Sequence, residues 1–110
     1  MGRSVKRNEG LMDRYSVSFF PEARNEALQA YLWYHAEQPG LEKKFREHLR
    51  NKIDSLKADP KASSFVYKNV RSSRMQIFPY SVIYRISNLN IQVIAVFHHS
   101  RNPRVWKKRI

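Results

Sequence analysis

The chain has 110 residues, of which 42% are hydrophobic and none is cysteine, so it can bury one modest core and has no disulfide or thiolate chemistry. Its 21 Lys and Arg outnumber nine Asp and Glu, giving a net charge of +12 that favours nucleic acid, an anionic surface or an acidic protein as partner over an inert basic surface. No apolar run approaches the roughly 20 residues of a membrane span, and the start lacks a hydrophobic secretion segment. We therefore expect a cytoplasmic protein with no membrane partner.

The first segment, residues 1–11, is polar and basic and shows no hydrophobic period. We expect it to be a disordered extension that precedes a single domain over residues 12–110. Tyr15, Val17 and Phe19 then alternate with serines, which is the period of a half-buried strand.

Two helices are predicted after this strand. Pro21 and Glu22 suit the first turn of a helix, and Pro39-Gly40 ends it. An apolar stripe follows at intervals of four, four, four and three residues, as expected for one face of a second helix. The stripe consists of Leu41, Phe45, Leu49, Ile53 and Leu56. Because the break between the helices is short, we expect an antiparallel hairpin.

Beyond residue 63 the period changes to two, and aromatic and β-branched residues predominate, which predicts a sheet. The expected strands are residues 65–70, 74–78, 80–86 and 91–97. Met75 and Ile77 fall on one side of the second strand, and Pro79, which cannot donate to a ladder, is placed at a bulge or between strands. The last strand is apolar on both faces apart from Gln92, so it should be covered on each side.

The fold class that follows from this order is α+β. It has an N-terminal strand, an antiparallel helical hairpin and then a mainly antiparallel twisted sheet. The hairpin can cover only one face of the sheet, which leaves part of the other face concave and open.

A basic, acid-free tail ends the chain, entered from the last strand through His98-His99-Ser100. Its cations can neutralise phosphate or carboxylate groups. Trp106 can either anchor a partner or close the core, and the sequence leaves both roles open. The candidate target-binding residues are Arg101, Arg104, Trp106, Lys107, Lys108 and Arg109.

Metal binding is a weak candidate activity for the two adjacent histidines. Neighbouring strand residues point to opposite faces, so His98 and His99 rarely bind one ion together. His35 and His48 could join them only from the helices. No metal and no other cofactor is therefore predicted.

Metal-free RNA cleavage is a second possibility, because it needs only a base, cations for the phosphorane and an acid. The candidate catalytic residues are Arg74, Arg85, His99 and Arg101, with Lys68, Arg71 and His98 as further cations. The same residue types are common on solvated sheet faces. The sequence does not show whether these residues lie close together in the fold.

The second half of the chain resembles the RelE/ParE superfamily of toxins from bacterial toxin–antitoxin systems. The resemblance rests on FPYSVIYRI at residues 78–86, IQVIAVFHHSRNP at residues 91–103, and Trp106. This progression is typical of the ParE-like branch, whose members are often described as plasmid stabilisation proteins. The predicted order of strand, hairpin and four strands matches the architecture of that superfamily.

The resemblance also carries expectations about function. RelE-like members cut messenger RNA in the ribosomal A site, and the resemblance would place a catalytic arginine and a tyrosine where this chain has Ser81 and Trp106. Serine cannot stabilise phosphorane charge as guanidinium does, and tryptophan has no ionisable proton to donate. An Arg101 or His99 substitute would be needed for that chemistry.

ParE-like toxins are instead associated with inhibition of DNA gyrase by binding. The resemblance thus implies a toxin that binds gyrase through its sheet face and basic tail, neutralised by an acidic, partly disordered antitoxin. The alternatives are a RelE-like ribonuclease that acts with the ribosome on mRNA and a non-toxic basic binding module.

Overall fold

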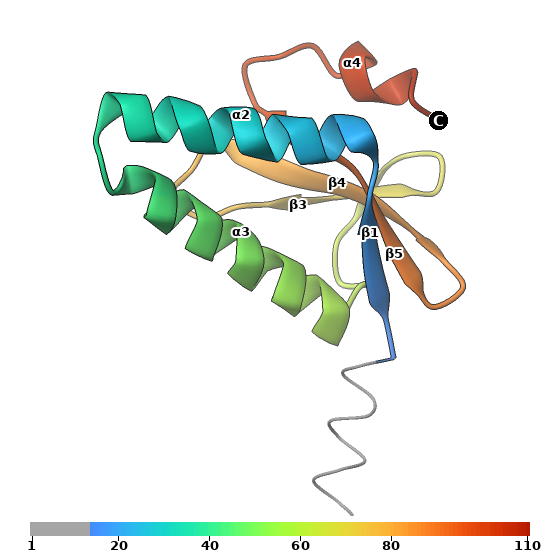
Figure 1. The fold of residues 1–110 in the computed structure, drawn as a ribbon. Helices are drawn as coiled ribbons and strands as arrows, with labels where there is room; N and C mark the ends of the chain where they lie inside the picture. Colours follow the sequence, from blue (N-terminus) through green and yellow to red (C-terminus); the bar gives the residue numbers. More distant parts are fainter. Residues whose placement is uncertain (1–13) are drawn as a thin grey trace, which may run out of the picture.

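The computed structural model describes residues 14–110, and the predicted extension over residues 1–11 and the predicted domain start at residue 12 lie outside this part of the chain. The elements in order are β1 (Ser16–Phe19), α2 (Pro21–Glu37), α3 (Leu41–Ala58), β2 (Phe65–Tyr67), β3 (Val70–Arg74), β4 (Tyr80–Ser87), β5 (Asn90–His98) and α4 (Arg104–Lys107). The predicted α+β class is confirmed (Figure 1). Among residues 14–110, no helix is long and apolar enough to cross a membrane.

The five strands form one sheet in the order β1-β5-β4-β3-β2. Neighbours are antiparallel except β1, which runs parallel to β5 from Ser16 opposite Asn90 to Phe19 opposite Val93. The first strand of the chain therefore pairs with the last. Because β1 ends opposite Val93, no strand among residues 14–110 lies beside the outer edge of β5 beyond that residue.

The hairpin of α2 and α3 packs across one face of the sheet, as predicted (Figure 1). Gly40, at the turn between the helices, has φ +101°, a conformation that residues with a Cβ avoid. Its N–H donates to Glu42 Oε1 at 2.7 Å. Under the hairpin, the rings of Tyr34, Phe45 and Phe78 lie with centroids 5.0–5.3 Å apart, which joins both helices to the segment before β4.

The opposite face of the sheet has a second apolar cluster under the C-terminal tail. Its buried members are Val70, Ile83, Ile94, Ala95, Phe97 and Trp106. Ile94 is skipped in the pairing of β4 with β5, since Ile83 lies opposite Ala95 and Tyr84 opposite Val93. This bulge places the consecutive residues Ile94 and Ala95 in the same cluster, where regular alternation would put only one of them.

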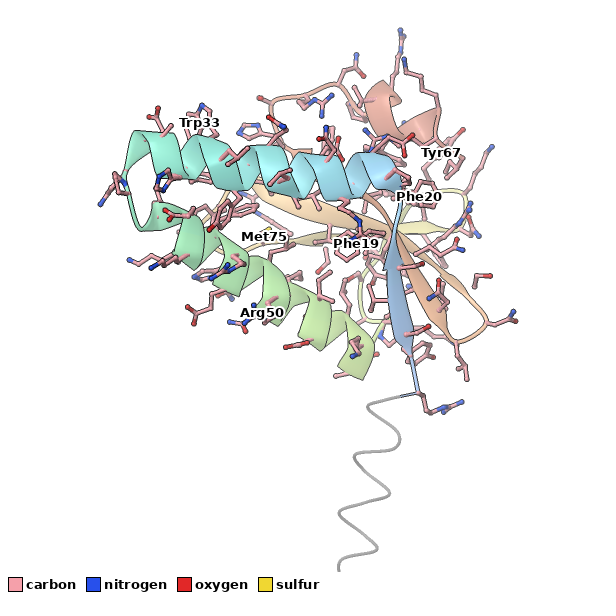
Figure 2. The ribbon with its side chains drawn as sticks, viewed as in Figure 1. Phe19, Phe20, Trp33, Arg50, Tyr67 and Met75 are labelled. Atoms are coloured by element: carbon pink, nitrogen blue, oxygen red, sulfur yellow. The ribbon has the colours of Figure 1, made fainter. Side chains whose placement is uncertain are left out.

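Three sequence expectations for this part of the chain are corrected by the structure. The strand predicted at residues 65–70 is divided, because β2 ends at Tyr67, Lys68 has φ +50° and β3 begins at Val70. The strand predicted at residues 74–78 is wrong, because β3 ends at Arg74 and the next residues form a tight loop closed by a 2.9 Å bond from the Met75 N–H to the Tyr80 carbonyl. Met75 is buried beneath the helices (Figure 2), whereas Ile77 is 81% exposed with φ +71°. The two side chains therefore do not share a face, and Pro79 lies between strands as predicted.

The hydroxyl of Tyr84 gives a test of how α3 is tied to the sheet. This fully buried side chain donates to the Pro60 carbonyl at 2.7 Å. Tyr84→Phe would leave that carbonyl buried without its donor, and we expect a loss of about 1–2 kcal/mol in the free energy of unfolding. Urea denaturation measures it, with Tyr31→Phe on the half-buried Tyr31 of α2 as control. Equal stability of the two variants would contradict this role of the hydroxyl.

Candidate functional site

The C-terminal tail is fixed to the first helix through one carboxylate. Glu26, on α2, accepts hydrogen bonds from Arg101 Nη1 at 2.9 Å and from Arg109 Nη1 and Nη2 at 2.9 and 2.8 Å. The Arg109 side chain is only 11% exposed, and its hydrogen bonds to Glu26 raise its pKa. We call Glu26, Arg101 and Arg109 the Glu26 cluster.

The Glu26 cluster also covers the open edge of β5. Glu26 Oε1 accepts from the Val96 N–H at 3.1 Å, and Arg109 Nη1 donates to the Ile94 carbonyl at 2.9 Å. Both backbone groups lie beyond the end of β1, where no strand in the described part of the chain pairs with them. A carboxylate and a guanidinium therefore take the place of a sixth strand along this edge.

The six predicted target-binding residues divide into two groups. Arg101, Arg104 and Lys108 are exposed, although the 45% exposed Arg101 side chain also pairs with Glu26. Lys107 is half-buried, with its ammonium 5.0 Å from the centre of the Tyr67 ring. Arg109 is committed to Glu26, so the exposed basic surface of the tail consists of Arg101, Arg104 and Lys108.

The sequence left two roles open for Trp106, packing in the core and binding a partner. In the structure this residue packs in the core. It is 4% exposed and closes the second apolar cluster, with its ring centroid 6.1 Å from that of Tyr67. Figure 2 shows Tyr67 beside α4. The tail thus folds as a short helix around a buried tryptophan and is not an extended basic strand.

A hollow of about 290 Å³ opens on the sheet face beside α4. Ser81 and His99 lie in it with Oγ and Nε2 2.8 Å apart. Burial, Arg74 and His98 lower the pKa of His99. The lining consists of Val66, Ser72, Ser81, Ile83, Phe97, His99, Pro103, Trp106 and Lys107. We call this the Ser81 hollow.

The four candidate ribonuclease residues are not gathered at one point. Arg74 lies opposite Ser81 in the β3–β4 register and acts on the charge of His99. Arg85 lies farther along β4, where its Nε donates to Gln92 Oε1 at 2.7 Å, and Arg101 is held by the Glu26 cluster. The structure therefore brings together only Arg74 and His99.

The histidines are dispersed as well. His98 lies against Tyr80 with ring centroids 4.9 Å apart, on a different side of β5 from His99. His35 Nδ1 is 3.1 Å from Glu42 Oε2, and His48 packs against Phe78. Within residues 14–110 no three His, Cys, Asp or Glu side chains form a group that could hold a metal ion.

Glu26 was missed by the sequence reasoning, although α2 has a signal for it. Ala23, Ala30 and Tyr34 are the buried residues of this helix, and Glu26 stands between them at spacings of three and four. A carboxylate on the buried face of a helix needs a cationic partner. In a chain with 21 Lys and Arg this position indicates an internal ion pair, but the partner cannot be identified from the spacing.

Comparison with known proteins places this architecture in a recognised group. The family model described as the ParE toxin of type II toxin-antitoxin system, parDE, matches residues 17–103. The fold is similar to a solved chain from a structure described as the chromosomal ParDE TA system from P. aeruginosa, with TM-score 0.69 and 16% sequence identity over 77% of this chain and 96% of that chain. A comparison with curated proteins gave no match.

Removal of the central carboxylate tests the Glu26 cluster. We expect Glu26→Ala to lower the free energy of unfolding by about 2–4 kcal/mol, because the largely buried Arg109 and the Val96 N–H would lose their acceptor. Chemical denaturation measures the change. The exposed Glu47 of α3 provides the control, since Glu47→Ala should cost less than about 0.5 kcal/mol. A similarly small effect at Glu26 would show that the cluster does not stabilise the tail.

The protonation of His99 gives a second test. NMR titration should find the pKa of His99 below its ordinary value of 6.5, and Arg74→Gln should raise it, because a neighbouring cation disfavours imidazolium. Arg50, which projects from α3 (Figure 2), serves as control, and Arg50→Gln should leave the His99 titration unchanged. If Arg74→Gln left the pKa of His99 unchanged, the two side chains would not lie close together in solution.

Proposed function

Since this chain belongs to the ParE toxin family of type II toxin–antitoxin systems, we propose that it arrests growth by binding DNA gyrase in the cytoplasm. The proposal rests on which residues line the Ser81 hollow. Ser81 and the buried Trp106 line this hollow, and the resemblance to the RelE/ParE superfamily implies an arginine and a tyrosine at these two positions in RelE-like ribonucleases. With neither group present there, binding is better supported than cleavage of mRNA.

The contact surface we propose is the exposed basic surface of the tail together with the adjoining sheet face. Arg101, Arg104 and Lys108 are fixed in position because Trp106 and Arg109 hold the tail on the domain. A cationic surface on a fixed backbone suits an anionic target such as a gyrase–DNA complex, since little backbone freedom is lost on binding.

An acidic antitoxin is the second partner we propose, in agreement with the ParDE description of the structural neighbour. The net charge of +12 favours rapid capture of an acidic segment. Helix α2 exposes Leu28, Leu32 and Trp33, of which Trp33 is labelled in Figure 2. Leu28 lines a groove of about 430 Å³ between α2 and α3. An antitoxin segment that folds on binding could cover these apolar side chains.

A ribosome-dependent ribonuclease is the second candidate, favoured by one specific observation. Arg74 and the neutral His99 lie close together on the sheet face and could act as cation and base. That activity predicts codon-phased cuts in translated mRNA, with loss on substitution of either residue. A non-toxic binding module would instead permit normal growth on induction.

Induced expression tests the toxin proposal as a whole. We expect growth arrest, rescue of growth when the adjacent small open reading frame is co-expressed, and stabilised cleaved DNA complexes when the purified protein is added to gyrase. Arrest with unaffected gyrase and phased mRNA cuts would assign the ribonuclease activity instead. Normal growth would contradict the toxin proposal and favour a non-toxic binding module.

Charge reversal in the tail tests the contact surface. Arg104→Glu with Lys108→Glu should abolish both arrest and gyrase trapping, because these exposed cations make no salt bridge in the structure of residues 14–110 and their loss should spare the fold. Lys43→Glu with Lys44→Glu on the exposed side of α3 makes the same change in net charge and should leave both activities. Arg101 is less informative, since a carboxylate there would repel Glu26. Equal activity of the two double variants would rule out the tail as the gyrase contact.

A further inference from the structure

The imidazole of His99 is held in a fixed position beside a serine hydroxyl. The backbone N–H of His99 donates to the Pro79 carbonyl at 3.0 Å, which fixes the main chain from which the ring projects. Its Nε2 lies 2.8 Å from Ser81 Oγ. A hydroxyl in hydrogen-bond contact with an imidazole is the pair from which an activated serine nucleophile is built.

The protonation state of His99 suits the role of base. Burial, Arg74 and His98 lower its pKa, so the ring is neutral at pH 7 and Nε2 can accept the Ser81 proton. The ionisable groups around it are Arg74 on β3, His98 on β5 and Lys107, which lines the same hollow on α4. Among the described residues that line the hollow there is no carboxylate, and the one contribution that raises the pKa of His99 comes from the Tyr80 backbone.

The surroundings of Ser81 indicate what the hollow can accept. Ser81 is 7% exposed and lies at the wall of the hollow, which is apolar where Ile83, Phe97 and Trp106 line it. A volume of about 290 Å³ is at the small end of ligand pockets and fits a short acyl chain. Lys107 adds a cation that can face negative charge developing on a carbonyl oxygen.

We propose that Ser81 is a nucleophile activated by His99 and that the Ser81 hollow accepts esters of short apolar acids. Ser81 Oγ bonds to the ester carbonyl carbon while its proton passes to His99 Nε2. The bond from that carbon to the alkoxy oxygen then breaks, and His99 returns the proton to the leaving alcohol. Water attacks the acyl-serine in the same way, so that ester and water give acid and alcohol. This activity is separate from gyrase binding and does not depend on it.

Covalent labelling of the full-length protein tests this proposal directly. An alkyl fluorophosphonate should phosphonylate Ser81 with loss of fluoride, as located by peptide mass spectrometry, and p-nitrophenyl butyrate should release p-nitrophenolate. We expect Ser81→Ala to abolish the adduct and His99→Gln to slow its formation by about 100-fold or more. The labelling rate should rise with pH through the lowered pKa of His99 and be level above pH 7.

The matched control is Ser87→Ala, because Ser87 lies on the same strand as Ser81 but is exposed at its end, opposite Asn90, and does not line the hollow. This variant should be labelled at the rate of the unchanged protein. Circular dichroism and thermal unfolding establish that each variant is folded. A hydrogen bond with a purely structural role would leave Ser81 unreactive, so the proposal is overturned if Ser81 reacts no faster than in the urea-unfolded protein or if His99→Gln leaves the rate unchanged.

Discussion

The Glu26 carboxylate is the group on which the arrangement of the C-terminal half depends. The short strand β1 pairs with β5 only as far as Val93, and the backbone beyond needs other partners. Glu26 and Arg109 supply them and in doing so hold the tail against the sheet. Trp106 can then close the second apolar cluster. One buried ion pair therefore links a helix, an open strand edge and the chain terminus.

This linkage changes how the basic tail can be used. A free tail with the same charges would lose conformational entropy on meeting its target, whereas a tail held by Arg109 and Trp106 has lost it on folding. The basic residues of the held tail also differ in their availability to a partner. Arg109 neutralises Glu26, whereas Arg104 and Lys108 remain in solvent. The number of cations in the sequence thus overstates the number available to a partner.

Local sequence patterns predicted the strand before the hairpin, both helices, β4 and β5, because each has either a regular period or a continuous apolar run typical of that element. They failed at residues 74–78, where the left-handed conformation of Ile77 turns the chain and separates side chains that alternation would place together. They also missed the pairing of Ser81 with His99 and of Glu26 with Arg109. These contacts join residues 18 and 83 positions apart, so only the tertiary fold brings them together.

The two proposed activities occupy different sides of α4. Arg104 and Lys108 are four positions apart, hence on one side of the helix, and both face solvent. Trp106 and Lys107 turn toward the sheet and line the Ser81 hollow. A target bound to the outer cations alone would leave the hollow open to a small ligand, whereas contact with the adjoining sheet face would close it. Because the sheet holds Ser81 and His99 through backbone bonds of its own, the chemistry of the hollow does not require an occupied basic surface.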